Sequence, residues 1–135
     1  MKRRRRKKLQ RQLVERAGWG EVHTLLRAGA EPDTPDRDGS TALYRASVSD
    51  RVENVRALLS AGADPNLESG TGDEGLPLCG AACWGHRTTV AMLLDAGADP
   101  ERREDHGQGR TAIEWAEAGG YHDTVDRLRA GLPAR

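Results

Sequence analysis

The sequence predicts an all-α fold, a solenoid of about four helix-turn-helix repeats joined by extended connecting loops. The phrase AGADP occurs at residues 61–65 and 96–100, and the near copy AGAEP occurs at residues 28–32. This phrase ends a longer unit whose glycines, Gly29, Gly62 and Gly97, are spaced by 33 and 35 residues. Composition agrees with the repeat, because a chain of 135 residues with 36% apolar residues and no Phe must build its core mainly from Leu, Val and Ala, which favours small, closely packed helices.

The first helix of each repeat is predicted by a second recurring phrase. It reads GSTALYRAS at residues 39–47, GLPLCGAAC at 75–83 and GRTAIEWAE at 109–117. The residues that precede the helix recur every 35 positions and are Thr41, Leu76 and Thr111. Small residues let neighbouring helices approach closely, and they recur inside this helix as Ala46, Ala81 and Ala116. The helix is expected to break at Gly85 and Gly120.

The second helix is predicted by one apolar stripe in the units VHTLLRAGAEPD, VRALLSAGADPN and VAMLLDAGADPE. Val55, Leu58 and Leu59 have the i, i+3, i+4 spacing that places them on one helical face. The helix should end at a left-handed glycine, and the proline three residues later prevents it from resuming. Because a one-sided helix needs a neighbour to cover its apolar face, the repeats are expected to stack.

These residues resemble the ankyrin repeat, whose usual pattern is D-x-x-G-x-T-P-L-H-x-A-A, then a glycine, a helix with V-x-x-L-L, and G-A-D. The resemblance runs from about Leu9 to Leu132. It implies one domain over residues 9–135: an N-terminal cap at about 9–33, complete repeats at about 34–66 and 67–101, and a C-terminal repeat at about 102–135. Terminal repeats of a solenoid have polar outer faces because no neighbour covers them.

Departures from the family pattern are informative. The position that usually holds His is occupied by Tyr44, Cys79 and Glu114, so the hydrogen bonds of that His must be replaced or absent. Leu76 replaces the usual Thr, and Asp50 replaces a glycine. The connecting segments LESGTGDEG and RREDHGQG carry about two extra residues each, which predicts two enlarged loops.

Charge divides the chain into a basic end and an acidic body. Eight of the 21 basic residues precede residue 12 and no acid does, so residues 12–135 hold 13 basic against 21 acidic residues, formally −8. We expect residues 1–8 to be a disordered tail able to bind phosphates of nucleic acid or of an anionic membrane. Its cations are Lys2, Arg3, Arg4, Arg5, Arg6, Lys7 and Lys8.

Other roles for this tail stay open. It could lie loosely against the acidic body or only aid solubility, and in a eukaryotic cell the same block could direct nuclear import. The abundance of Ala, Gly and Arg suggests a GC-rich, bacterial genome, which argues against nuclear import.

The resemblance implies a non-catalytic module that binds a protein partner through a concave face and loop tips, although a fold alone does not fix a function. The residues expected on that surface are Arg37, Asp38, Ser40, Tyr44, Val48, Asp73, Cys83, Trp84, Gln108 and Arg110. Trp84 is the strongest candidate because Trp is enriched among binding hot spots. The alternative is that Trp84 packs over a neighbouring loop with only an edge exposed. We expect Trp19 and Trp115 to be packing residues.

Catalytic and metal chemistry are not predicted. Cys79, Cys83 and His86 lack the fourth ligand of a structural zinc site, and no phosphate-binding loop occurs. No cofactor and no small-molecule substrate are expected. An unusual small enzyme with a pocket near Trp84, Tyr44 and Cys79 stays as a third alternative. A disulfide between cysteines four apart in one helix would be strained, and no apolar span or export signal is evident, so we expect a reducing, cytoplasmic location.

Overall fold

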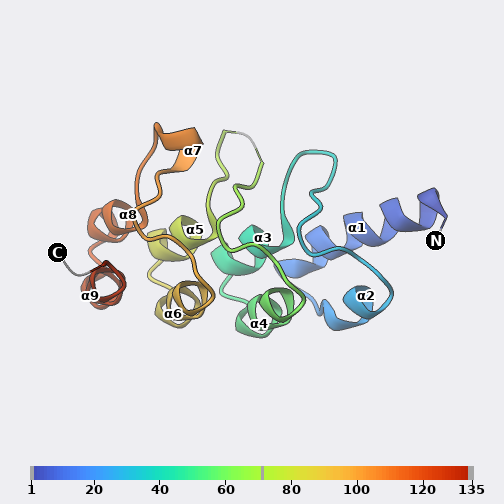
Figure 1. The fold of residues 1–135 in the computed structure, drawn as a ribbon, viewed down its shortest axis with the longest axis horizontal. Coiled ribbons are helices and arrows are strands. Elements are labelled where there is room, and N and C mark those ends of the chain that lie inside the picture. Colours follow the sequence, from blue (N-terminus) through green and yellow to red (C-terminus); the bar gives the residue numbers. More distant parts are fainter. Residues whose placement is uncertain (1, 71, 134–135) are drawn as a thin grey trace.

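The protein is described here by a computed structural model that covers residues 2–70 and 72–133. These residues form nine helices and no strand, which confirms the predicted all-α fold. Figure 1 shows the paired helices in two rows that form a stack, with the chain termini at its opposite ends. The row of first helices contains α1 (Arg3–Ala17), α3 (Ala42–Val48), α5 (Pro77–Cys83) and α8 (Ala112–Gly119). The row of second helices contains α2 (His23–Arg27), α4 (Val52–Ser60), α6 (Arg87–Asp95) and α9 (His122–Ala130).

The core consists of the predicted apolar stripes and small residues. Leu58, Leu93 and Leu128 occupy the same position in successive second helices, and each is 0% exposed. The equivalent small residues of the first helices are also 0% exposed and are Ala46, Ala81 and Ala116. With only a methyl group at these positions, α3, α5 and α8 pack closely side by side.

Left-handed residues end the helices where the glycines predicted them. Gly62 and Gly97 have φ of 96° and 100° after the second helices. Asp50 stands where the family has a glycine, and its φ is 55°. Its carboxylate accepts a 2.8 Å hydrogen bond from the Thr89 hydroxyl of the next repeat. This bond offsets part of the cost of a non-glycine residue in a left-handed conformation.

The basic segment differs from the expectation of a disordered tail, because residues 3–8 form the first turns of α1. The second half of α1 is anchored in the stack, where Leu9, Leu13 and Val14 are buried. Gln10 joins it to the first connecting loop through two hydrogen bonds to backbone carbonyls and one from the Glu31 amide. Since Arg and Lys are good helix formers, the anchored half provides a nucleus from which the helix extends outward.

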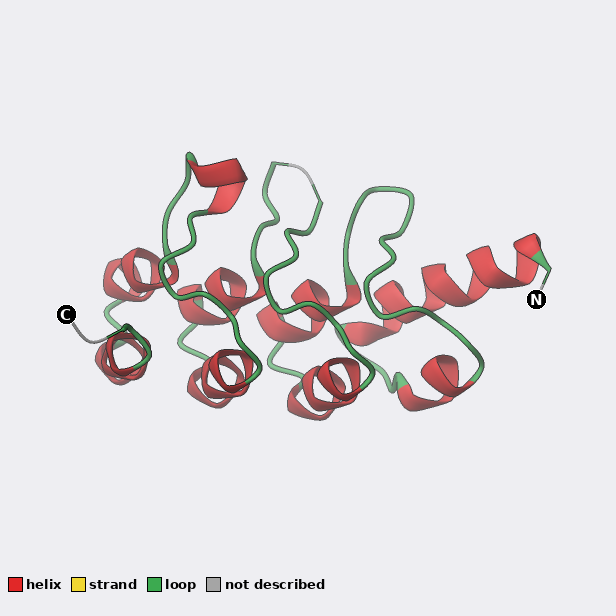
Figure 2. Cartoon of the chain, viewed as in Figure 1, coloured by secondary structure: helices red, strands yellow, loops and turns green. Residues whose placement is uncertain are grey.

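Three fingers connect the repeats and project beyond the row of first helices (Figure 2). One backbone hydrogen bond closes each finger: Asp36 to Ser40 at 3.0 Å, Ser69 to Gly75 at 2.9 Å and Glu104 to Arg110 at 3.1 Å. These bonds span four, six and six residues, so the second and third fingers are each enlarged by two residues, as predicted. The third finger contains α7 (Glu104–Gly107), whose Asp105 and His106 have φ of 53°, so it is a left-handed turn.

Candidate functional site

A small apolar cluster forms where α3 meets α5. A Cβ placed on Gly80 would lie 3.0 Å from Tyr44 Cε2 and 3.5 Å from Val48 Cβ, so both α3 side chains lie directly on the α5 backbone. On the same helix, the Cys83 thiol donates to the Gly80 carbonyl oxygen at 3.3 Å. The structure therefore brings together three of the predicted site residues, Tyr44, Val48 and Cys83, around a glycine whose missing side chain makes room for them.

Trp84 follows Cys83 at the C-terminal end of α5, and its side chain is largely in solvent, with 59% of the residue exposed. This exposure excludes the alternative in which Trp84 packs over a loop with only an edge showing. The indole therefore belongs to the exposed surface at the end of α5.

The other two tryptophans differ from each other. Trp19 is 63% exposed, so the expectation that it packs between the first two helices was wrong. The carbonyl oxygen of the neighbouring Gly20 accepts a 2.8 Å hydrogen bond from the Asn54 side chain of the second repeat. The backbone of this turn, and not the Trp19 side chain, therefore joins it to the stack. Trp115 is partly buried against the core, as expected, and its indole N–H donates to Glu104 Oε1.

A recurring hydrogen bond joins the first helices of the second and third repeats to the finger that follows each of them. The backbone N–H of Thr41 donates to Ser69 Oγ at 2.8 Å, and that of Leu76 donates to Glu104 Oε2 at 2.9 Å. In both cases the side chain that begins one finger accepts from the start of the preceding repeat's first helix. In the fourth repeat the Thr111 amide donates instead to Glu114 of its own helix at 3.2 Å. Successive fingers are thereby fixed to one another.

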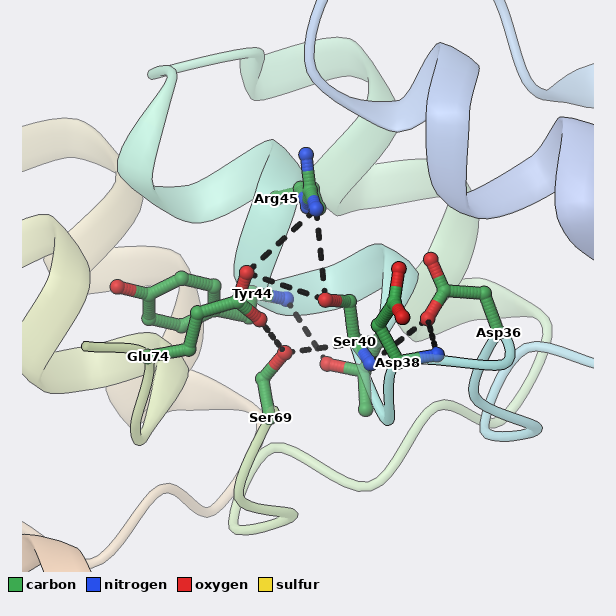
Figure 3. Close-up of polar contacts among 8 residues, drawn as sticks. Asp36, Asp38, Ser40, Tyr44, Arg45, Ser69 and Glu74 are labelled. Carbon is green, nitrogen blue, oxygen red and sulfur yellow. Dashed lines mark hydrogen bonds and ion pairs between the residues drawn. The ribbon is translucent and has the colours of Figure 1, made fainter. Parts of the chain in front are cut away.

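The Glu74 carboxylate extends this network between the first and second fingers (Figure 3). It accepts from Ser69 Oγ at 2.7 Å and Ser40 Oγ at 3.1 Å, and Arg45 lies 3.5 Å away. Ser40 is only 2% exposed, so it is not available to a partner as we expected, and its hydroxyl instead holds Glu74 in place. The short side chain of Ser69 bridges Glu74 and the Thr41 amide, a role that no local pattern in the sequence indicates.

The finger residues expected to contact a partner lie on the exposed surface. They are Arg37 and Asp38 on the first finger, Asp73 on the second, and Gln108 and Arg110 on the third. The Arg110 guanidinium lies 4.8 Å from the centroid of the Trp115 ring, a cation–π geometry that restrains this arginine at the finger base.

Comparison with known families agrees with this architecture. Residues 38–69, which span the first finger, α3, α4 and the start of the second finger, match the ankyrin repeat family model. The chain contains ankyrin repeats. Ankyrin repeats are generally protein-interaction modules, and the family is typically non-catalytic.

Three relatives share segments with this ankyrin stack. The chain is 36% identical over 115 residues to the E3 ubiquitin-protein ligase KEG of Arabidopsis thaliana. The aligned segment covers 84% of this chain and 7% of that protein. The chain is 34% identical over 112 residues to glycerophosphocholine phosphodiesterase gde1 of Schizosaccharomyces pombe. This segment covers 80% of this chain and 9% of that protein. The chain is 36% identical over 62 residues to human BCL-6 corepressor-like protein 1. This segment covers 45% of this chain and 4% of that protein. The chain therefore spans less than a tenth of the length of each of these relatives.

Electrostatics keep the ankyrin repeats' apolar cluster uncharged. Burial raises the pKa of Tyr44 to about 12, with further contributions from the carboxylates of Glu104 and Glu74. Burial also raises the pKa of the Cys79 and Cys83 thiols, with Glu104 as the next cause. A thiol whose pKa is raised stays protonated and is a poor nucleophile.

Residues 2–70 and 72–133 contain no candidate metal site and no helix suited to cross a membrane. No three His, Cys, Asp or Glu side chains converge there in a way that could hold a metal ion. None of the helices in those ranges combines the length and apolar character needed to cross a bilayer. A surface hollow of about 430 Å³ is lined by residues of α2 and α4 and the start of the following loops, away from Trp84, Tyr44 and Cys79.

Glu104 provides a prediction about pH. Burial raises its pKa, although hydrogen bonds from Trp115 and Leu76 oppose the shift. An acid whose pKa is higher in the folded state contributes most to stability below its unfolded pKa of about 4.3, and this contribution is lost as the pH rises through the folded pKa. We therefore expect the unfolding free energy of the wild type to fall relative to that of Glu104→Gln as the pH rises from about 4 to neutrality.

Urea denaturation of both proteins at each pH measures this difference. The matched control is Glu114→Gln, because the pKa of Glu114 is instead lowered, first by the Thr111 backbone hydrogen bond. The unfolding free energy of the wild type should therefore rise relative to that of Glu114→Gln as the pH increases over the same range. A parallel pH dependence for the two variants would contradict the assignment of the Glu104 shift to burial.

Proposed function

We propose that this ankyrin stack is a non-catalytic module that binds a protein partner through one continuous recognition face. The face joins the apolar cluster and Trp84 to the exposed finger residues. Its members are Arg37, Asp38, Tyr44, Val48, Asp73, Cys83, Trp84, Gln108 and Arg110. The observation that carries the proposal is the exposure of Trp84, 59%, directly after Cys83 of the packed cluster in the sequence.

The energetics of such a face favour binding at its apolar part. A large aromatic side chain loses little conformational entropy when it becomes buried, and it removes a large apolar area from water. Tyr44 and Val48 are already held on the Gly80 backbone, so they need little reordering when a partner covers them. We expect the partner to place an apolar side chain against Trp84 and the cluster.

The fingers supply the polar part of the recognition face. The bonds from Thr41 to Ser69 and from Leu76 to Glu104 hold the second and third fingers against the preceding repeats, and the bond from Ser40 to Glu74 joins the first finger to the second. Arg37, Asp73 and Arg110 therefore present charges of both signs from a restrained framework. Charges at the rim of an interface contribute chiefly to orientation and association rate. The partner is expected to carry complementary charges around its apolar anchor.

Crosslinking to proteins of the native host, followed by mass spectrometry and an affinity measurement with the purified partner, tests this proposal. The double variant Trp84→Ala/Arg110→Ala is expected to weaken binding by at least about 2 kcal/mol, or about 30-fold in Kd. The matched control is Trp19→Ala/Arg129→Ala, which removes an equally exposed tryptophan and an exposed arginine outside the recognition face. The proposal fails if both double variants bind the partner as tightly as the wild type does, or if both lose the same amount of affinity for the partner.

A further inference from the structure

The N-terminal half of α1 is a charged extension that the recognition face does not use. The basic extension is defined here as Lys2–Lys8 together with Arg11, and all eight side chains are exposed. Figure 1 shows this end of α1 reaching out of the stack, past α2. Among the ion pairs of the described residues, none involves a cation of the basic extension. The body therefore does not neutralise the extension.

The helical form of this segment distributes its charge around the whole helix. Successive residues of an α-helix are rotated by about 100°, so the six cations of residues 3–8 cover every side of it. The first apolar side chain of α1, that of Leu9, is buried in the stack. A helix that lies on a membrane needs an apolar face opposite its charged face. The basic extension has none, which disfavours the anionic membrane as its partner.

We propose that the basic extension binds the phosphate backbones of double-stranded DNA, with the helix lying in the major groove. That groove is about 12 Å wide, and an α-helix with side chains is about 10–12 Å across. Phosphates border the groove on both sides, so a helix charged all round can contact both strands at once. The deep, narrow major groove of duplex RNA does not admit such a helix.

The charge of the body orients the complex. Residues 12–135 carry a formal charge of −8, which repels a polyanion and confines contact to the extension. The stack then projects away from the duplex, and its recognition face stays available to a protein. DNA binding is thus independent of the proposed protein-binding function, and either can fail without the other.

Local energetics agree with an anionic partner. The first turn of α1 contains no acidic residue, and no side chain caps its N-terminus. Cations at this end of a helix are disfavoured by the helix dipole and by repulsion between neighbouring cations. Bound phosphates would remove this repulsion, so the extension gains from a polyanion more than a capped, neutral helix would.

The magnitude follows from counterion release. If roughly half of the eight cations contact phosphates, about four contacts form, and log Kobs should fall against log salt with a slope of about −3.6. The binding carries no base-specific contact in this account, because backbone contacts position a protein without reading sequence. Duplexes of unrelated sequence should therefore bind with similar affinity.

Fluorescence anisotropy of the full chain with a labelled DNA duplex of about two helical turns tests the proposal. The extension variant carries Arg3→Gln, Arg4→Gln, Arg6→Gln and Lys7→Gln, since Gln keeps a similar helix propensity. The control variant carries Arg27→Gln, Arg56→Gln, Arg102→Gln and Arg129→Gln, which removes four exposed arginines of the body and gives the same net charge. The extension variant should lose about 100-fold in affinity near 0.1 M salt and about half of the salt slope, whereas the control variant should keep both to within a few-fold.

Two further probes make the outcome decisive. Duplex RNA of the same length and vesicles containing phosphatidylserine are titrated under the same conditions. Weaker binding to both than to duplex DNA supports the proposal. Equal losses in the two variants would overturn it, because net charge alone would then account for binding, and tighter binding to vesicles or to RNA would overturn it by assigning the extension to another partner. Thermal unfolding of both variants near the wild-type temperature confirms that the stack is intact.

Discussion

Leu58→Ala is expected to lower the free energy of unfolding by about 2–5 kcal/mol, because it removes a fully buried side chain from the middle of the stack. Leu58 is on α4, which packs against α3 of its own repeat and α6 of the next. A single repeat cannot bury its own apolar face, so a cavity in a central repeat weakens the interfaces on both sides of it. The loss is a large part of the 5–15 kcal/mol that typically stabilises a domain.

The adjacent residue provides the control for this prediction. Leu59 is only partly buried, so Leu59→Ala should cost clearly less, about 1 kcal/mol. Urea denaturation followed by circular dichroism measures both losses, with the slope of the transition showing whether unfolding stays cooperative. Equal losses at the two positions would show that Leu58 is not the buried member of the pair.

Gly85→Ala is expected to destabilise the protein by about 2–4 kcal/mol, because two costs add at this position. Gly85 has φ of 70°, where any other L-residue is strained. In addition, a Cβ there would collide with the aromatic ring of Tyr121, which belongs to the next repeat. Either the ring or the turn must move, and both are packed at the junction between repeats.

Gly120 separates the two costs, since it occupies the same position in the following repeat. Its φ is 74°, and nothing lies within 4 Å of a Cβ placed on it. Gly120→Ala should therefore cost only the strain, about 1–2 kcal/mol. Chemical denaturation of the two variants, and of Gly85→Ala combined with Tyr121→Ala, gives the packing contribution. If Gly85→Ala costs no more than Gly120→Ala, the collision with Tyr121 is not what makes glycine necessary.

The candidate site was predictable only where a local pattern places a side chain. Val48, Cys83 and Trp84 occupy repeat positions near the end of a first helix, and the structure gathers the first two with Tyr44 around Gly80. The same reasoning placed Ser40 on the surface, and this prediction was wrong. Ser40 is buried because Glu74 of the next finger covers it and accepts a hydrogen bond from its hydroxyl. That carboxylate is 34 residues away in sequence, and its position depends on how the enlarged finger folds.

The missing His position shows the same limit. The sequence indicated that the hydrogen bonds of this His are replaced or absent, and it did not indicate which groups would replace them. Ser69 and Glu104 supply the acceptors from the following finger, while Glu114 supplies one from its own helix. Three residues of two types, in different local settings, accept these bonds, so no single motif reports them.

The sequence by itself determined the two helices of each repeat, their order, the ends that glycine marks, and their stacking. Those features depend on interactions within a few residues, namely apolar spacing, proline, and glycine at left-handed positions, and the repeat makes each signal recur. Only the tertiary structure decided that Trp19 and Trp84 are exposed, that the basic segment is helical, and which side chains hold the fingers together. Each of these depends on contacts between groups far apart in the sequence, or on anchoring by the buried half of a helix, and the free energies of such contacts are set by the distances that folding creates.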